Sequence, residues 1–264
     1  MRDAIADISN VRRLRNAAHT LLHRSRGTPG IGMVSGAVGL GKTTATRHIC
    51  IVEDAVWVEA LPDWTPRWML ADIAGELGAE RAPQTERNFR MIVGALRERR
   101  RAIFIDEADR LVKRMHLAET LRAIHDATDA PLILIGMAAL PKAIRAIPQI
   151  ESRVAHWVEF QPCDFRDARA MADQLCEIVL DDDLVRHLHQ VSGGSARSIR
   201  IGLERIENYA RRRAKKALTL DDLPDGFDLI YARRDHKAPA AEAAIPRVAA
   251  ARANEAETGL REAS

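Results

Sequence analysis

The sequence predicts an α/β fold, with a parallel five-stranded sheet flanked by helices and a small all-α region after it. Three observations support this prediction. Short apolar runs alternate with segments of helical periodicity as far as Pro162. A glycine-rich loop joins the first of these runs to a helix, and beyond Pro162 the apolar spacing is helical alone.

The chain divides into four regions by these patterns. Residues 1–30 form an N-terminal helix, over 4–24, and a turn-rich linker; residues 31–162 form the α/β core; residues 163–228 form the helical region; and residues 229–264 form a charged, flexible tail. The predicted strands are Ile31–Val34, Ala55–Ala60, Ala102–Ile105, Leu132–Ile135 and Val154–Phe160. The helices of the helical region are expected near 166–180, 182–191 and 195–214, with a last turn from Asp221.

Composition excludes several classes of protein. No apolar run approaches the roughly 20 residues that span a bilayer, so no membrane partner is expected. The three cysteines show neither metal-ligand nor redox spacing, which indicates a reducing, cytoplasmic location. The formal net charge of +3 does not by itself indicate nucleic acid, but the basic residues are clustered.

The glycine-rich loop matches the phosphate-binding pattern G-x-x-x-x-G-K-[ST] at every position. The matching residues are Gly36, Ala37, Val38, Gly39, Leu40, Gly41, Lys42 and Thr43, with Thr44 next to them. Backbone N–H groups of such a loop, and the positive end of the helix after it, bind phosphate. Lys42 is expected to reach the β- and γ-phosphates of ATP, and the Thr43 hydroxyl to ligate Mg²⁺.

A pair of acids follows the third predicted strand. Asp106 ends this apolar run, where it can approach the magnesium, and Glu107 can orient and deprotonate the attacking water. The same two acids would also suit the start of the next helix, where the helix dipole favours negative charge. Because one strand pattern separates the loop from the acids, the P-loop strand and the acid-bearing strand are not expected to be neighbours in the sheet.

Together these motifs resemble the AAA+ superfamily of ATPases across about residues 10–225. The resemblance implies an arginine finger that reaches a neighbouring subunit's γ-phosphate, and Arg153 before the fifth strand fits it, with Arg145 as an alternative. It also implies that the helical region is a lid with a nucleotide-contacting arginine. Arg197, after Gly193-Gly194, fits this role, with Arg200 as the alternative. The family's polar residue at the end of the fourth strand is replaced by Gly136-Met137, so hydrolysis is expected to be slow or partner-dependent.

Within that superfamily the chain looks most like the DNA-transposition ATPases, the B protein of Mu-like transposing phages and the TniB/TnsC regulators. The resembling stretches are Gly36–Thr44, Ile103–Arg110, Leu132–Gly136, Glu151–Val154 and Gly193–Arg197. This resemblance implies an ATPase that forms a homo-oligomer, a hexamer-like ring or a helical filament, on double-stranded DNA. It would select target sites and activate a transposase.

Clusters of basic residues are candidates for binding the phosphates of DNA without sequence preference. The resemblance nominates Arg67, Arg87 and Arg90, and charge clustering adds Arg99, Arg100, Lys113 and Arg114, with a further cluster over Arg211–Lys216. Several of these residues end helices, where a solvated basic terminus is an equal explanation.

Other functions are open to an AAA+ protein of this length. A secretion-type ATPase that remodels a protein partner is expected to carry a membrane anchor or a peptidoglycan module. A replication initiator or helicase loader is expected to carry a DNA-binding helical domain after the lid. The sequence shows neither module, which favours the transposition hypothesis.

Overall fold

The computed structural model describes residues 1–230, which form one compact unit. The strands of the main sheet are β1 (Ile31–Ser35), β2 (Val56–Glu59), β3 (Ile103–Asp106), β4 (Leu132–Ile135) and β5 (Val154–Glu159). They lie in the order β2-β3-β4-β1-β5, and every pair is parallel. The sequence prediction of a parallel five-stranded sheet is confirmed.

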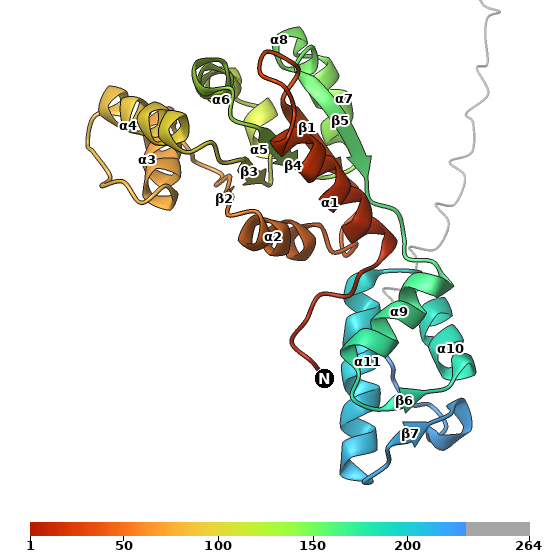
Figure 1. The fold of residues 1–264 in the computed structure, drawn as a ribbon. Helices are drawn as coiled ribbons and strands as arrows, with labels where there is room; N and C mark the ends of the chain where they lie inside the picture. Colours follow the sequence, from red (N-terminus) through yellow and green to blue (C-terminus); the bar gives the residue numbers. More distant parts are fainter. Residues whose placement is uncertain (231–264) are drawn as a thin grey trace, which may run out of the picture. The chain divides into compact units, whose positions relative to one another are not determined.

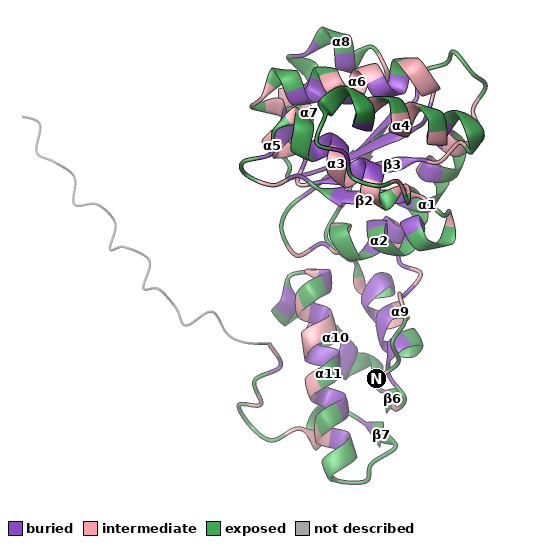
Figure 2. Cartoon of the chain, turned by 90° about the vertical axis from the view of Figure 1, so that its left-hand side faces the viewer, coloured by how far each residue is buried: buried purple, intermediate pink, exposed green. Residues whose placement is uncertain are grey.

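Helices cover both faces of this sheet (Figure 1). Those of the core are α1 (Ser9–Leu22), α2 (Lys42–Val52), α3 (Pro66–Glu76), α4 (Thr85–Glu98), α5 (Asp109–Val112), α6 (Met115–Thr128), α7 (Leu140–Arg145) and α8 (Pro148–Glu151). Helices α1 and α2 contribute to one buried cluster, and α3 to α8 to the other. In Figure 2 the helices are buried along one side and exposed along the other, as amphipathic helices on a sheet must be.

The two faces follow directly from the period-2 geometry of the strands. In β3, Ile103 and Ile105 belong to the cluster under α3 to α8, whereas Phe104 belongs to the cluster under α1 and α2. The same alternation divides β4, in which Leu132 and Leu134 face opposite to Ile133 and Ile135. Both faces are therefore apolar, which is why these strands read as continuous apolar runs.

The region after the core contains α9 (Phe165–Leu175), α10 (Asp182–Ser192), α11 (Ala196–Arg212) and a 3₁₀ turn, η1 (Leu220–Asp222). It also contains β6 (Val179–Leu180) and β7 (Ala217–Leu218), which pair in parallel. The predicted helix 166–180 therefore ends at Leu175, and the expectation of helices alone missed this sheet. Strands of two residues carry no periodicity that a sequence can show.

Two further differences concern the ends of the N-terminal helix and the reason given for the strand order. Helix α1 begins at Ser9, not near residue 4, and residues before it run along α9, with the Arg2 amide donating to the Leu175 carbonyl at 2.7 Å.

The prediction that the P-loop strand β1 and the acid-bearing strand β3 are not adjacent is confirmed. The strand that separates them is β4, however, and not β2, on which the prediction was based. The predicted tail lies outside the described residues, apart from Leu229 and Ile230; Leu229 is buried against the lid.

Candidate ATP site

The P-loop joins the carboxyl end of β1 to the start of α2. Its glycines at 36, 39 and 41 all have positive φ, of 152°, 84° and 86°, which other residues rarely adopt. A Cβ on Gly36 would lie 2.8 Å from the Phe160 carbonyl oxygen, so the close approach of β5 also requires glycine there. The Lys42 ammonium folds back over the loop and donates to the carbonyl oxygens of Gly36 and Ala37, at 2.7 and 2.8 Å.

The two acids lie at the carboxyl end of β3, at the same edge of the sheet as the P-loop. Asp106 is buried, with 4% of its surface exposed, and its Oδ1 accepts the Glu107 amide at 2.9 Å. Glu107 has a φ of 55°, a left-handed conformation that costs a residue with a side chain on the order of 1–3 kcal/mol. Strain of this kind persists where surrounding structure fixes a side chain in a required direction.

Glu107 is not electrostatically isolated. Its Oε2 lies 4.0 Å from the guanidinium of Arg110, which also lies 3.6 Å from Glu59 and donates to the Ala60 carbonyl at the end of β2. This arginine is half-exposed, so the pair is screened and contributes little to stability. Its role in the site is to restrain where the Glu107 carboxylate lies.

The electrostatics at Lys42 show how close the charged groups of the site are. Burial lowers the pKa of Lys42, while the charges of Asp106, Glu107 and Asp109 raise it and that of Arg197 lowers it again. Three acidic side chains and one arginine therefore lie close enough to Lys42 to change its pKa. Such a constellation can neutralise a polyphosphate and still retain a carboxylate for proton transfer.

The lid contributes through the start of α11. The Arg197 amide donates to the Gly39 carbonyl at 2.9 Å, and the Ser195 hydroxyl donates to the same oxygen at 3.3 Å. Arg197 and Arg200 both line a pocket of about 360 Å³ with the P-loop, Asp106 and Glu107. The structure thus brings both lid candidates to the P-loop, and Arg200 also contacts the Ala4 carbonyl, at 3.5 Å.

One wall of this pocket was not expected from the sequence. It is apolar, and it comes from the N-terminal segment and the lid: Ile5, Ile8, Val11, Met171, Leu175 and Ile201. An apolar wall opposite a phosphate-binding loop suits the base of a nucleotide. The only sequence signal was the apolar spacing of the first three residues, which predicted a helix over 4–24 and not a pocket wall, because the residues that complete the wall lie some 160 positions away.

The donors available for a metal are oxygens. The Thr43 hydroxyl and the second Asp106 oxygen suit Mg²⁺, which binds through one or two protein oxygens together with phosphates and water. Within residues 1–230 no cluster of three or more His, Cys, Asp or Glu could hold a metal on protein ligands alone. The three cysteines are free and buried, and burial raises the pKa of each to about 12, so they supply no thiolate.

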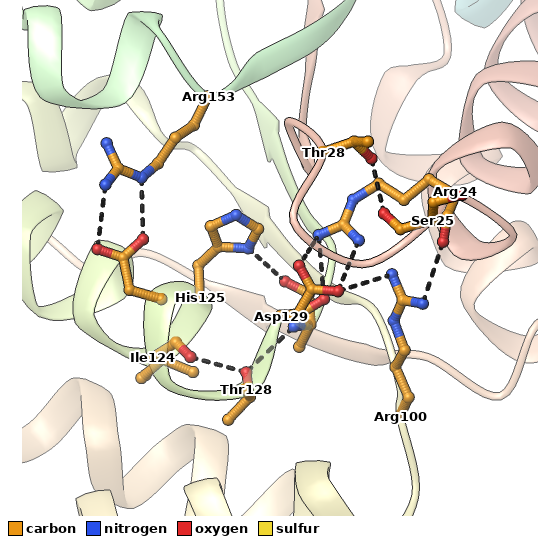
Figure 3. Close-up of polar contacts among 11 residues, drawn as sticks. Arg24, Ser25, Thr28, Arg100, Ile124, His125, Thr128, Asp129 and Arg153 are labelled. Atoms are coloured by element: carbon orange, nitrogen blue, oxygen red, sulfur yellow. Dashed lines mark hydrogen bonds and ion pairs between the residues drawn. The ribbon is translucent and has the colours of Figure 1, made fainter.

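Arg153 lies at the opposite, amino edge of the sheet. It directly precedes β5, and its carbonyl accepts the Ile31 amide at the start of β1. Its guanidinium is held by Asp126, with Nε–Oδ1 at 2.9 Å and Nη2–Oδ2 at 3.2 Å (Figure 3). The alternative, Arg145, lies over the ring of Trp157, 4.9 Å from its centroid. Neither arginine lines the ATP pocket of its own chain.

The seven basic residues nominated for DNA do not form one surface. Those that follow β2 and β3, or begin α3 and α4, lie toward the carboxyl edge of the sheet, whereas Arg99 and Arg100 precede β3 at the amino edge. Four of them pair with carboxylates: Arg90 with Glu86, Arg99 with Asp54, Arg100 with Asp129 and Arg114 with Asp63. Arg67, Arg87 and Lys113 make no ion pair with any residue of the described chain.

Comparisons with known proteins agree on the fold. Residues 24–144 match the family model of the AAA domain. No curated protein matches the chain by sequence. Among solved structures, the ORC2 protein of Aeropyrum pernix in its ADP form is similar over 84% of this chain and 69% of that one, with a TM-score of 0.66 and 20% identity.

Two more solved structures extend the comparison. The ORC1 protein of Aeropyrum pernix in complex with DNA is similar over 82% of this chain, with a TM-score of 0.57 and 20% identity, and the chain spans only 63% of its length. The RuvB Holliday junction branch migration motor of Thermotoga maritima is similar over 82% of this chain and 67% of that one, with a TM-score of 0.54 and 18% identity.

The likeness to these structures concerns the fold, and the family match concerns the segment that carries the P-loop and the two acids. No helix among residues 1–230 is long and apolar enough to cross a membrane. Residues 24–144 match the AAA domain, and the chain has an α/β fold of the AAA+ P-loop type.

Proposed function

We propose that this chain is a Mg²⁺-dependent ATP hydrolase that binds double-stranded DNA when it holds ATP, assembles on it, and activates a transposase. One observation carries the ATPase part: the P-loop, the acid pair Asp106-Glu107 and Arg197 converge on one pocket from three separate segments of the chain. The transposition part rests on the sequence resemblance to the transposition ATPases.

In the proposed reaction, the oxygen of a water molecule attacks the γ-phosphorus and Glu107 takes a proton from it. The bond between the γ-phosphorus and the β,γ-bridging oxygen breaks, and its electron pair stays on ADP, so that the products are ADP and phosphate. Lys42 and Arg197 neutralise the phosphate oxygens as charge develops. Thr43 and Asp106 would hold Mg²⁺, which would supply further neutralisation of the phosphate charge.

The proposed role of Arg153 requires a second subunit. Its place at the amino edge of the sheet is remote from the P-loop of its own chain, so a finger at this position can act only on a neighbour's nucleotide. An arginine finger supplied in trans is worth about 10³–10⁵ in turnover in the ATPases and GTPases where it has been measured. ATP between subunits would then link assembly to nucleotide state, in a ring or a filament.

The DNA surface that we propose lies on α3 and α4, near the ends that begin them. Arg67 and Arg87 are free of ion pairs within the described chain, and Trp68 beside them is 44% exposed. Thr65, Arg67 and Trp68 line a surface groove together with Pro83, at the start of α4. Unpaired arginines are available to phosphates, whereas Arg99 and Arg100 already contact carboxylates, each shared with a second arginine.

A replication initiator or helicase loader is the alternative that the comparisons favour, because one structure of similar fold is an ORC1 protein in complex with DNA. Both functions predict ATP-dependent DNA binding, and only one predicts a transposase. An ATPase that remodels a protein partner predicts neither.

The test measures binding to a duplex of arbitrary sequence, with ATP and with ADP, for the wild type and for Glu107→Gln. We expect binding with ATP only, a steep loss with added salt, and large, persistent complexes of Glu107→Gln. Stimulation of DNA strand transfer by a transposase from the same genome then separates transposition from initiation. Wild type that hydrolyses ATP but ignores duplex at low salt in every nucleotide state would contradict the DNA part and leave the ATPase part intact.

A further inference from the structure

The carboxyl end of β4 faces the ATP pocket but carries no polar side chain. The strand ends at Ile135, and the next two residues, Gly136 and Met137, line the pocket with Lys42 and Glu107. Hydrolysis needs a group here because the attacking water must be fixed from more than one side for the near-attack geometry to be populated. Glu107 alone approaches that water from β3.

An aspartate from the neighbouring turn, Asp109, does not itself line the pocket but lies against the backbone of Gly136 and Met137, which do. The Met137 amide donates to Oδ2 of Asp109 at 2.7 Å. A Cβ built on Gly136 would lie 2.2 Å from the same oxygen and 3.0 Å from the Asp109 Cγ. The carboxylate of Asp109 therefore stands where a side chain at position 136 would begin, and only glycine at 136 leaves room for it.

The backbone holds Asp109 in this position. The Ala108 amide donates to the Ile135 carbonyl at 2.7 Å, which continues the pairing of β3 and β4 past the end of β3. Leu111, which is buried, anchors the short helix α5 that begins at Asp109. Asp109 is half-buried, and its charge is one of three that act on Lys42, with those of Asp106 and Glu107.

We propose that Asp109 is a positioning residue for ATP hydrolysis: its carboxylate replaces the polar side chain that the end of β4 lacks. One oxygen fixes the backbone at Met137, and the other accepts a hydrogen bond from the attacking water while Glu107 accepts its proton. This inference rests on the proposed ATPase function. It also explains why the acid pair and Asp109 lie within one turn of chain, since both are needed at the same end of the sheet.

Asp109→Asn separates the two tasks of the carboxylate. The amide oxygen can still accept from the Met137 amide, but the amide nitrogen is a donor and cannot accept from water. We expect kcat to fall on the order of 10²-fold in Asp109→Asn and Asp109→Ala alike, with the KM for ATP and the melting temperature of Asp109→Asn unchanged. The affinity for ADP–aluminium fluoride, which mimics the transition state, falls with kcat, whereas the affinity for ADP does not.

A reciprocal pair of variants tests the shared space. Gly136→Ser alone is expected to lower kcat because its Cβ collides with Asp109. In the Asp109→Ala background the same change meets no carboxylate. The remaining close atom is Leu140 Cδ2 at 2.8 Å, the end of a flexible side chain that can move, and the serine supplies a hydroxyl near the same point. We therefore expect the double variant to turn over ATP about tenfold faster than Asp109→Ala. It would then remain about tenfold slower than wild type.

The outcomes separate this inference from the function on which it rests. Asp109→Asn with a kcat within twofold of wild type would show that the carboxylate only ties down Met137 and would overturn the inference alone. A double variant no faster than Asp109→Ala would overturn it as well. Wild type that neither hydrolyses ATP, with or without duplex DNA, nor binds ADP–aluminium fluoride more tightly than ADP would overturn the ATPase proposal and this inference with it.

Discussion

Both edges of the central sheet carry charged residues, but the partners to which these residues bond differ between the two edges. At the carboxyl edge, Lys42 bonds only to carbonyl oxygens of its own loop, and Glu107 is held in a strained conformation. At the amino edge, Arg24 is 6% exposed and donates to both oxygens of Asp129 at 3.0 and 2.9 Å, with Arg100 on the same carboxylate (Figure 3).

This difference separates charged side chains that stabilise the fold from charged side chains that remain available to bind a ligand. A buried arginine bound by both oxygens of a carboxylate has little capacity left, and breaking such a pair costs stability. Charged groups that make only backbone contacts, beside a strained carboxylate, can exchange those contacts for phosphate and water. Arg153, the proposed finger, is the exception, because it lies at the paired edge and would have to leave Asp126 to reach a neighbouring subunit.

The largest effect is expected at the carboxyl edge. Lys42→Ala removes the only lysine of the P-loop, and charge-assisted hydrogen bonds are worth about 1.5–3 kcal/mol each. Two such bonds to phosphate correspond to a loss of ATP affinity on the order of 10²–10⁴-fold. Equilibrium binding of a fluorescent ATP analogue measures this. Lys113→Ala, a lysine with no contact to the pocket lining, is the matched control and should bind as wild type does.

Arg153→Ala tests whether an arginine of the paired edge acts on a neighbour. We expect turnover to fall by about 10³-fold, with ATP affinity retained. Mixing Arg153→Ala with Lys42→Ala subunits should restore part of the activity, because each mixed interface can join an intact finger to an intact P-loop. Arg122 binds the same Asp126 carboxylate at 2.7 Å, so Arg122→Ala is the control. Equal losses in the two variants would show that Arg153 is structural.

Asp129→Asn should lower the free energy of unfolding and leave the rate of ATP turnover unchanged. It leaves Arg24 buried against an uncharged partner, which typically costs about 3 kcal/mol of unfolding free energy. Urea unfolding measures the loss, and ATP turnover per folded molecule should match wild type. Glu86→Gln removes a pair whose side chains are both more than 70% exposed, Arg90–Glu86, and should cost under about 1 kcal/mol. A fall in ATP turnover with Asp129→Asn would contradict the view that the ion pairs of the amino edge stabilise the fold without acting in hydrolysis.

The smallest effect concerns pH. His125 is buried near Asp129, and its Nδ1 lies 2.7 Å from the Ala130 carbonyl. Burial lowers the pKa of His125, although the hydrogen bond to Ala130 opposes this. The unfolded chain then binds a proton that the folded chain does not, so stability falls as pH drops below about 6.5. His125→Asn keeps a donor near that carbonyl and does not titrate, so it should flatten the decline in unfolding free energy between pH 7.5 and 5.5. A decline as steep as in wild type would contradict this role.

The fold, and the pocket shared by the P-loop and the acid pair, could be predicted because their signals are local. Strand, loop and helix around Gly36–Thr43 are contiguous in the sequence, and so are the apolar strand and the acids at 103–107. The apolar wall of the pocket and the role of Asp109 could not be predicted. They depend on which strand ends lie side by side, and adjacency of β3 and β4 is set by the order of strands in the sheet.

The basic residues nominated for DNA show a second limit of prediction from sequence. Clustering along the chain identified Arg99 and Arg100. Their ion-pair partners, Asp54 and Asp129, are distant in the sequence, so these ion pairs could not be predicted from it. Arg67 and Arg87 do not form a cluster in the sequence at all. The segment between α3 and α4 brings Pro83 back to the groove that Arg67 and Trp68 line, a return that the sequence does not show.

The central claim is that the carboxyl edge hydrolyses ATP through Glu107, and steady-state release of phosphate from ATP by the wild type, Glu107→Gln and Glu159→Gln tests it most directly. Glu159 is an exposed glutamate at the end of β5 and controls for loss of an acid at this edge. The account predicts magnesium-dependent turnover in wild type and Glu159→Gln, and a loss of about 10²–10⁴-fold in Glu107→Gln with ATP still bound. Turnover by Glu107→Gln equal to that of wild type would contradict it.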